Sequence, residues 1–248
     1  MTQKLNLVVL LSGLAASGVS MAQATAAAAP APDYTLAFNV GAVTDYRYRG
    51  ISQSRLKPAI QGGIDFSHKS GFYLGTWASS IKWIKDAGGD ADAEVDIYGG
   101  YKFAGGPVGF DVGVLRYLYP NASISPSPYT TEVYVAGTYG PATLKYSHAV
   151  TNLFGFADSK NSYYVDLSAG FDLPWYGLTL TPHIGYQSVN HNSGASYTDW
   201  SLTLGKDFGN GFSASLAYVD TNTNAYLAPT NGKDLGKATA VLGVKYTF

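Results

Sequence analysis

The sequence predicts an all-β protein, a transmembrane antiparallel up-and-down β-barrel of about 12 strands with periplasmic termini. Three observations lead to this prediction. Apolar and polar residues alternate with period two from residue 34 to the last residue, and no segment shows helical periodicity. Short turns and long loops alternate strictly along the chain, as in a closed barrel with two unlike rims. Only 13% of the residues are charged, whereas average soluble domains carry about a quarter.

The first 24 residues are typical of an export signal. Lys4 precedes the apolar run LNLVVLLSGLAA, and small residues follow at the spacing that a signal peptidase needs, so cleavage is expected after Ala24 or, nearly as well, after Ala22. A retained membrane anchor is the alternative, but the apolar run is short for a helix that spans a bilayer. The expected organisation is a cleaved signal peptide (1–24), a short flexible lead-in (25–33) and an outer-membrane barrel (34–248).

The first six strands are expected where apolar residues recur at every second position. In 94–103, Val95 and Ile97 share one face and Glu94 and Asp96 share the other. In 72–79 either face could be the apolar one. The expected strands are 35–43 (TLAFNVGAV), 59–67 (AIQGGIDFS), 72–79 (FYLGTWAS), 94–103 (EVDIYGGYKF), 109–117 (GFDVGVLRY) and 131–139 (TEVYVAGTY).

The last six strands follow the same alternation. Pro182 is the one irregular residue, because proline has no N–H to donate to a ladder, so we expect a bulge there or a strand that begins later. The expected strands are 142–150 (ATLKYSHAV), 162–171 (SYYVDLSAGF), 178–187 (LTLTPHIGYQ), 198–208 (TDWSLTLGKDF), 211–219 (GFSASLAYV) and 239–248 (TAVLGVKYTF). Five short turns and six long loops join the twelve strands, and the long loops are 44–57, 80–92, 119–129, 151–161, 189–197 and 220–237.

The apolar faces could point into a soluble core or out to lipid. The polar faces are mostly Gly, Ser, Thr, Gln, Asn and Tyr, whereas a soluble surface needs roughly a quarter to a third charged residues. We therefore expect Leu242 and Val244 to face lipid, and the polar positions to face an enclosed lumen. Interfacial aromatic girdles are expected from Tyr101, Phe103, Tyr117, Tyr119, Tyr139, Phe171 and Tyr218.

The chain ends in alternating residues that finish on Phe248. Lipid offers no partners for backbone groups, so the last strand is expected to pair fully with the first. A terminal Phe also resembles the C-terminal signal of bacterial outer-membrane proteins, which implies recognition by the barrel assembly machinery. The other expected partners are outer-membrane lipid, lipopolysaccharide and small solutes. The near-zero net charge gives no reason to expect nucleic acid.

Charged residues on the polar faces are the candidate pore-lining groups. They predict either a water-filled, mildly cation-preferring lumen or a salt-bridged interior that braces the barrel and leaves little open pore. Twelve strands lie between barrels filled by side chains and barrels that leave a channel. The candidates are Asp65, Glu94, Asp96, Lys102, Asp111, Glu132, Lys145, Asp166 and Asp199.

The alternating stretch Tyr46, Arg47, Tyr48 and Arg49 follows the first strand. It could form a constriction or binding feature of the lumen. The alternative is a solvated or ion-paired rim, in which the arginines pair with lumen carboxylates.

Other site chemistry has weak support in the sequence. The loop KDAGGDADAEVD could hold a divalent cation through Asp86, Asp90, Asp92, Glu94 and Asp96, but it lacks the EF-hand order, so a solvated acidic loop is expected and no metal site. A hydrolase would need a Ser/His/Asn or Asp/His group near the outer rim. Ser147 and His148 fall on opposite faces of one strand, and no GxSxG, HExxH or phosphate-loop pattern occurs. We expect no enzymatic activity and no cofactor.

The stretch TDYRYRGISQS (44–54), followed by KPAIQGGIDFSHKSGFYLGTWAS, resembles the start of the TorF-type porin family of proteobacteria. The similarity continues through EVDIYGGY, LRYLYP and YVDLSAGFDLP. The resemblance implies an outer-membrane barrel that passes small solutes, without fixing which. The expected function is therefore a porin for passive diffusion of small polar solutes or ions through a narrow polar lumen. The alternatives are a non-conducting barrel with an adhesive or structural role, and an outer-membrane hydrolase.

Overall fold

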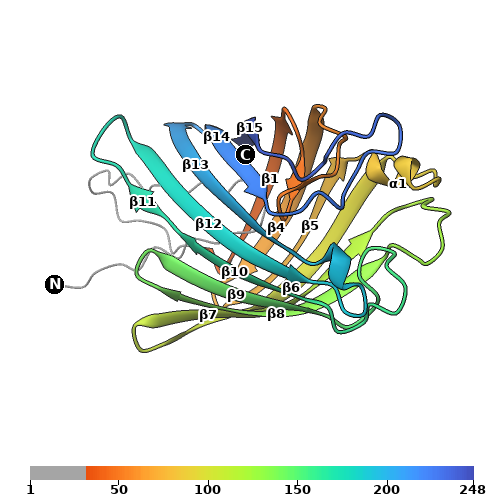
Figure 1. Cartoon of the computed structure of the whole chain (residues 1–248). Helices are drawn as coiled ribbons and strands as arrows, with labels where there is room; N and C mark the ends of the chain where they lie inside the picture. The colour runs from red at the N-terminus through yellow and green to blue at the C-terminus, as the bar shows by residue number, and fades with distance from the viewer. Residues whose placement is uncertain (1–31) are drawn as a thin grey trace, which may run out of the picture.

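A single antiparallel sheet closes on itself into a barrel (Figure 1). The structure is a computed structural model that describes residues 32–248, so the expected signal peptide and most of the expected lead-in lie outside the described residues. The strands are β1 (Tyr34–Val43), β4 (Ala59–His68), β5 (Phe72–Ser80), β6 (Ala93–Gly105), β7 (Val108–Leu118), β8 (Thr130–Tyr139), β9 (Ala142–Ala149), β10 (Tyr163–Ala169), β11 (Phe171–Asp172), β12 (Leu178–Ser188), β13 (Tyr197–Gly209), β14 (Phe212–Thr221) and β15 (Thr239–Thr247). Because β10 and β11 both pair with β12 and form one interrupted strand, the ring has 12 strands, as predicted.

The ring closes where the last strand meets the first. β1 pairs with β4 on one side and with β15 on the other, in a register that runs from Asn39↔Thr247 to Val43↔Gly243. Beyond this ladder, Phe38 and Phe248 exchange both backbone hydrogen bonds at 2.9 Å, and their rings stack with centroids 5.8 Å apart. The last strand is thus paired with the first, as predicted, although the ladder covers only part of each strand and not its full length.

The two faces of each strand differ as the sequence predicted. On β15, Leu242 and Val244 are 57% and 47% exposed on the outer face, whereas Val241 on the inward face is buried. In β6, Ile97 is exposed while Glu94 and Asp96 are buried inside the ring. Apolar side chains thus cover the outer surface and polar ones fill the interior, which is the arrangement of a barrel surrounded by lipid.

This inversion gives a first prediction, for the variant Leu242→Arg. Leu242 is more than half exposed on the outer face near the middle of β15, where a lipid-facing arginine is expected to cost about 2–4 kcal/mol of folding stability. The measurement is urea unfolding of the barrel refolded in lipid vesicles. Lys245→Arg, at an inward position of the same strand, is the matched control and should change stability little. Equal losses in both variants would contradict the assignment of the faces.

The two rims are unlike, as predicted. One rim, here the turn rim, carries the short connections 69–71, 106–107, 140–141, 173–177 and 210–211. The opposite loop rim carries the long connections 44–58, 81–92, 119–129, 150–162, 189–196 and 222–238, which include α1 (Trp83–Asp86), the 3₁₀ helix η1 (Ser193–Ala195) and the strands β2 (Arg47–Tyr48) and β3 (Ile51–Ser52). None of the helices in residues 32–248 has the length and apolar character needed to cross a membrane.

The two halves of the lumen are packed differently. In the loop half, inward side chains are buried and join a cluster that includes Ile81, Ile84 and Tyr117. In the turn half, inward side chains such as Asp65, Lys102 and Thr203 are partly exposed. Solvent therefore reaches the turn half, while the loop half is filled by side chains.

The prediction of an interfacial girdle is wrong for two residues. Tyr117 and Tyr119 are 2% and 1% exposed and lie inside. Tyr117 is six positions from the inward Asp111, so strict alternation puts both on the same face. Tyr119 follows the end of β7 and packs edge-on against Trp83 with centroids 5.0 Å apart. The other predicted girdle residues, Tyr101, Phe103, Tyr139, Phe171 and Tyr218, are exposed.

The bulge or late start expected at Pro182 is also wrong. β12 runs through Pro182, which pairs with Leu202 of β13 in unbroken register. On the other side the pairs Ser168↔His183 and Phe171↔Leu180 keep the same register, so no residue is inserted. The missing N–H of Pro182 interrupts the neighbouring strand instead, and splits it into β10 and β11. The ambiguous strand β5 buries Tyr73 and exposes Leu74.

Candidate functional site

The loop after β1 enters the barrel and does not stay at the rim. We call residues 44–54 the inner hairpin. Its strands β2 and β3 pair through Arg47↔Ser52 and Tyr48↔Ile51, and the turn between them uses Arg49 (φ 47°) and Gly50 (φ 80°). Positive φ at both central residues is the geometry of a tight hairpin turn. A Cβ at Gly50 would lie 2.5 Å from Thr221 Cγ2 and 2.8 Å from Asp199 Cβ, so only glycine brings the tip this close to the wall.

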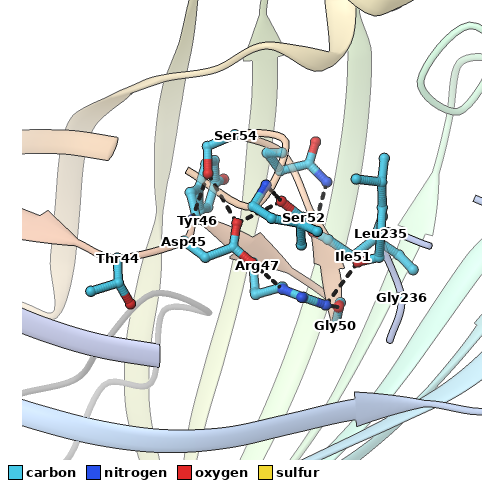
Figure 2. A network of polar contacts seen from close by, with 12 residues as sticks. Thr44, Asp45, Tyr46, Arg47, Gly50, Ile51, Ser52, Ser54, Leu235 and Gly236 are labelled. Carbon is cyan, nitrogen blue, oxygen red and sulfur yellow. Dashed lines mark hydrogen bonds and ion pairs between the residues drawn. The ribbon is translucent and has the colours of Figure 1, made fainter. Parts of the chain in front are cut away.

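Asp45 organises the base of the inner hairpin (Figure 2). Its carboxylate accepts hydrogen bonds from Ser52 Oγ at 2.5 Å, Ser54 Oγ at 3.0 Å and Arg47 Nε at 2.6 Å. Arg47 also donates through one terminal nitrogen to the carbonyl oxygens of Gly50 (2.8 Å) and Leu235 (2.7 Å). Arg47 therefore connects the base and the turn of the inner hairpin and binds the hairpin to loop 222–238.

Arg49 ties the tip of the inner hairpin to the opposite wall. Its guanidinium donates to both oxygens of Glu132 (2.7 and 3.0 Å) and to Gln187 Oε1 (2.6 Å), and it lies 4.2 Å from the ring centroid of Tyr164. Burial opposes the charge of Arg49, but Glu132 raises the pKa of the guanidinium well above its usual range. A buried, bidentate pair of this kind fixes position as well as charge.

Two tyrosines hold the rest of the inner hairpin in place. Tyr46 Oη donates to Glu94 Oε1 at 2.6 Å, and the hydroxyl groups of Tyr48 and Tyr117 lie 2.5 Å apart. Burial, together with the nearby Glu94, raises the pKa of Tyr46 well above its usual value, so its phenol remains a donor. Tyr46, Arg47, Tyr48 and Arg49 are thus brought together inside the lumen, in contact with β6, β7, β8 and β12.

All nine predicted pore-lining residues are on inward positions of their strands. Glu94, Asp96, Glu132 and Asp199 are buried in the loop half. The others, Asp65, Lys102, Asp111, Lys145 and Asp166, are partly exposed. Among these five partly exposed residues, two accept hydrogen bonds from tyrosine hydroxyls: Asp65 from Tyr98 at 2.5 Å and Asp111 from Tyr73 at 2.7 Å.

The inward lysines do not form the salt bridges of a braced interior. Lys102 Nζ lies 4.7 Å from the ring centroid of Tyr73, and Lys145 Nζ lies 4.2 Å from that of Tyr134. Within the part of the chain that the structure describes, neither ammonium has a carboxylate oxygen within 4.0 Å. The ion-paired carboxylates of the lumen are bound instead by Arg47, Arg49 and His183.

His183 is a lumen residue that the sequence reasoning missed. Its Nδ1 lies 3.0 Å from Asp166 Oδ2 and its Nε2 lies 2.8 Å from Asp199 Oδ1. Its position two residues after Thr181 and four before Gln187 puts it on the polar face of β12. That parity could have identified it, but the adjacent proline made the strand assignment uncertain.

The carboxylates of the acidic loop do not converge. Asp86 pairs with Arg55, Asp92 pairs with Lys82 and Lys85, and Glu94 turns into the lumen. Across residues 32–248, no group of three or more His, Cys, Asp or Glu side chains is placed to hold a metal ion. The observed arrangement is therefore an ion-paired loop.

The comparisons with known proteins agree with this architecture. A family model described as "Bacterial protein of unknown function (Gcw_chp)" matches residues 27–248. Among solved structures, the KdgM porin has a TM-score of 0.57 at 9% identity, over 86% of this chain and 99% of that one. The NanC porin has a TM-score of 0.51 at 11% identity, over 86% and 99%. At such identities the likeness concerns the fold alone. No curated protein matches the sequence.

Proposed function

Since the chain belongs to the Gcw_chp family of bacterial proteins, whose function is unknown, we propose a function from the barrel itself. The protein is an outer-membrane channel that lets small polar solutes or ions diffuse passively through a narrow lumen. The observation that carries the proposal is the closed ring with apolar side chains outside and charged side chains inside. A lipid-facing barrel must pair its backbone groups internally, and here the pairing of β15 with β1 closes the ring.

The orientation follows from the two rims. In outer-membrane barrels short turns face the periplasm and long loops face outward, so the turn rim and both ends of the barrel are periplasmic. Two likenesses support the proposal of a channel: residues 44–54 resemble TorF-type porins, and the fold is similar to that of the KdgM and NanC porins. Phe248, paired with Phe38 at the turn rim, is the proposed recognition point for the assembly machinery, and lipopolysaccharide is the proposed lipid around the loop rim.

The nine pore-lining residues and the inner hairpin define the proposed path. Solutes that enter from outside meet the constriction formed by the inner hairpin first, which limits passage to small molecules, and then the partly exposed turn half. Over the strands and the inner hairpin, inward carboxylates outnumber inward cations by ten to six, which supports a mild preference for cations. The carboxylates are Asp45, Asp65, Glu94, Asp96, Asp111, Glu132, Asp166, Asp172, Asp199 and Asp207, and the cations are Arg47, Arg49, Lys102, Lys145, His183 and Lys245.

Planar-bilayer recording under a KCl gradient tests the proposal. The refolded protein is expected to give small discrete conductance steps and a weakly cation-selective reversal potential. Heat-dependent gel mobility verifies the folded barrel in the same preparation, and a boiled sample is the silent control. A barrel that is folded and inserted but gives no steps would contradict passive conduction by this state of the protein.

One observation favours a second candidate, a non-conducting structural or adhesive barrel. Tyr117, Glu132 and Thr130 are almost fully buried in the loop half, so the inner hairpin and its surroundings fill that part of the lumen. The two candidates differ in the effect of removing the inner hairpin. A hydrolase is not favoured, because Ser147 and His148 lie on opposite faces of β9, with Ser147 buried inside and His148 partly exposed outside.

A further inference from the structure

His183 lies between two carboxylates in a way that fixes its protonation. Both ring nitrogens are within 3.0 Å of an Asp oxygen, Nδ1 with Asp166 and Nε2 with Asp199. A neutral imidazole has one donor and one acceptor, so it can satisfy only one ionised carboxylate. The imidazolium has two N–H donors, so it can donate to both carboxylates, and both hydrogen bonds are then charge-assisted.

The surroundings of His183 contain further charged and titratable groups. Tyr164 of β10 donates to Asp199 at 2.9 Å and has its hydroxyl 3.2 Å from His183 Nε2. Lys145 of β9 is in direct register with Asp166. Arg49 of the inner hairpin lies over the ring of Tyr164. The cluster therefore joins β9, β10, β12, β13 and the hairpin.

The cluster spans the boundary between the two halves of the lumen. Asp199 is 2% exposed and lies under the hairpin tip, where Gly50 approaches its Cβ. The side chains of His183 and Asp166 are 18% and 16% exposed, so they reach the solvent of the turn half. A charge on His183 therefore acts on Asp199, against which the hairpin tip packs, and on solutes at the boundary between the two halves of the lumen.

We propose that His183, held as an imidazolium, is a specificity-determining residue of the lumen that also seats the tip of the inner hairpin. Its charge compensates two carboxylates, and its two hydrogen bonds hold Asp199 where Gly50 packs. The effect on ion selectivity rests on the proposed channel function. The effect on the hairpin does not depend on conduction.

Removing the charge has two consequences. Asp166 and Asp199 would face each other without a cation between them, and the excess of inward negative charge would grow from four to five. Carboxylates that line a passage attract cations, so selectivity for cations increases. Asp199 is buried, and a buried charge without its partner is strongly unfavourable, so it would move toward water and loosen the hairpin tip.

The test compares His183→Gln with His183→Arg. Arginine keeps the positive charge and can donate to both carboxylates, whereas glutamine keeps polarity without charge. Both changes are made in the variant Ile51→Cys, because the chain contains no cysteine and Ile51 is buried in the hairpin. Maleimide labelling of the single thiol that Ile51→Cys introduces then reports exposure of the hairpin, and the reversal potential reports selectivity. His148→Gln, at an outward position of β9, is the matched control.

We expect His183→Gln to raise the rate of thiol labelling at position 51 about tenfold and to raise cation selectivity, since unit charges interact strongly at short range. His183→Arg and His148→Gln should resemble the parent in both measurements. Heat-dependent mobility confirms that each barrel is folded. Labelling at the parent rate in folded His183→Gln, or equal effects of Gln and Arg, would overturn the proposal. If the parent is silent in bilayers, the channel function fails while the labelling result still decides the role of His183.

Discussion

Replacing Arg47–Ser52 by a short Gly/Ser linker is expected to raise single-channel conductance several-fold. These residues fill the centre of the loop half and contact β7, β8 and β12. The scaffold should survive the change, because β1 and β4 pair continuously from Tyr34↔His68 to Val43↔Ala59 without help from the loop between them. Adjacent antiparallel strands can be joined by a few residues. The measurement is planar-bilayer conductance in matched salt.

A matched control is Tyr176→Ser in the exposed turn 173–177, which touches no part of the constriction and should leave conductance unchanged. The deletion also separates the two candidate functions. A parent that is silent and a deletion variant that conducts would favour a barrel closed by its inner hairpin. Unchanged small steps in the deletion variant, with the barrel folded, would show that the hairpin does not set the width of the path.

The second large effect is expected for Glu132→Gln. Glu132 is 1% exposed and accepts two hydrogen bonds from Arg49. Removing one partner of a buried ion pair leaves an uncompensated charge and typically costs about 3–5 kcal/mol. We expect the barrel to lose a large part of that amount in denaturant unfolding, and the inner hairpin to open intermittently, which would appear as flickering steps of higher conductance.

Two controls define what Glu132→Gln measures. Asp33→Asn removes the partner of Lys69 at the exposed turn rim, and such pairs are worth about 0–1 kcal/mol. The double variant Arg49→Met with Glu132→Met removes both charges, and it should be more stable than either single variant because no buried charge is left alone. If the single change costs no more than Asp33→Asn, the pair does not hold the hairpin.

Strand positions and faces were predictable because lipid and lumen impose opposite demands on successive residues. Leu242, Val244 and the nine inward charged residues follow from alternation alone, and so does the closure of the ring at Phe248. The same rule, applied strictly, would have placed Tyr117 inside. At Tyr117 the preference of aromatic residues for interfaces conflicts with parity, and parity decides the face.

The arrangement of the loops was not predictable from alternation, because a loop has no period that tells which way it points. The stretch 46–49 was identified as unusual, but nothing local in it specifies Glu132, Gln187 or Glu94 as partners, since these lie on strands far away in the chain. The role of Asp45 depends on serines that follow it by seven and nine residues. The contacts of Tyr46 and Arg49 form only when β6, β8 and β12 surround the hairpin.

The contact between Arg47 and the carbonyl oxygen of Leu235 joins a segment near the start of the barrel to its last long loop. The inner hairpin is therefore among the first parts of the ring to be synthesised and among the last that can reach its final position. Until loop 222–238 and β15 are in place, the inner hairpin lacks its hydrogen bonds to this loop. Final placement of the constriction is thus coupled to completion of the wall.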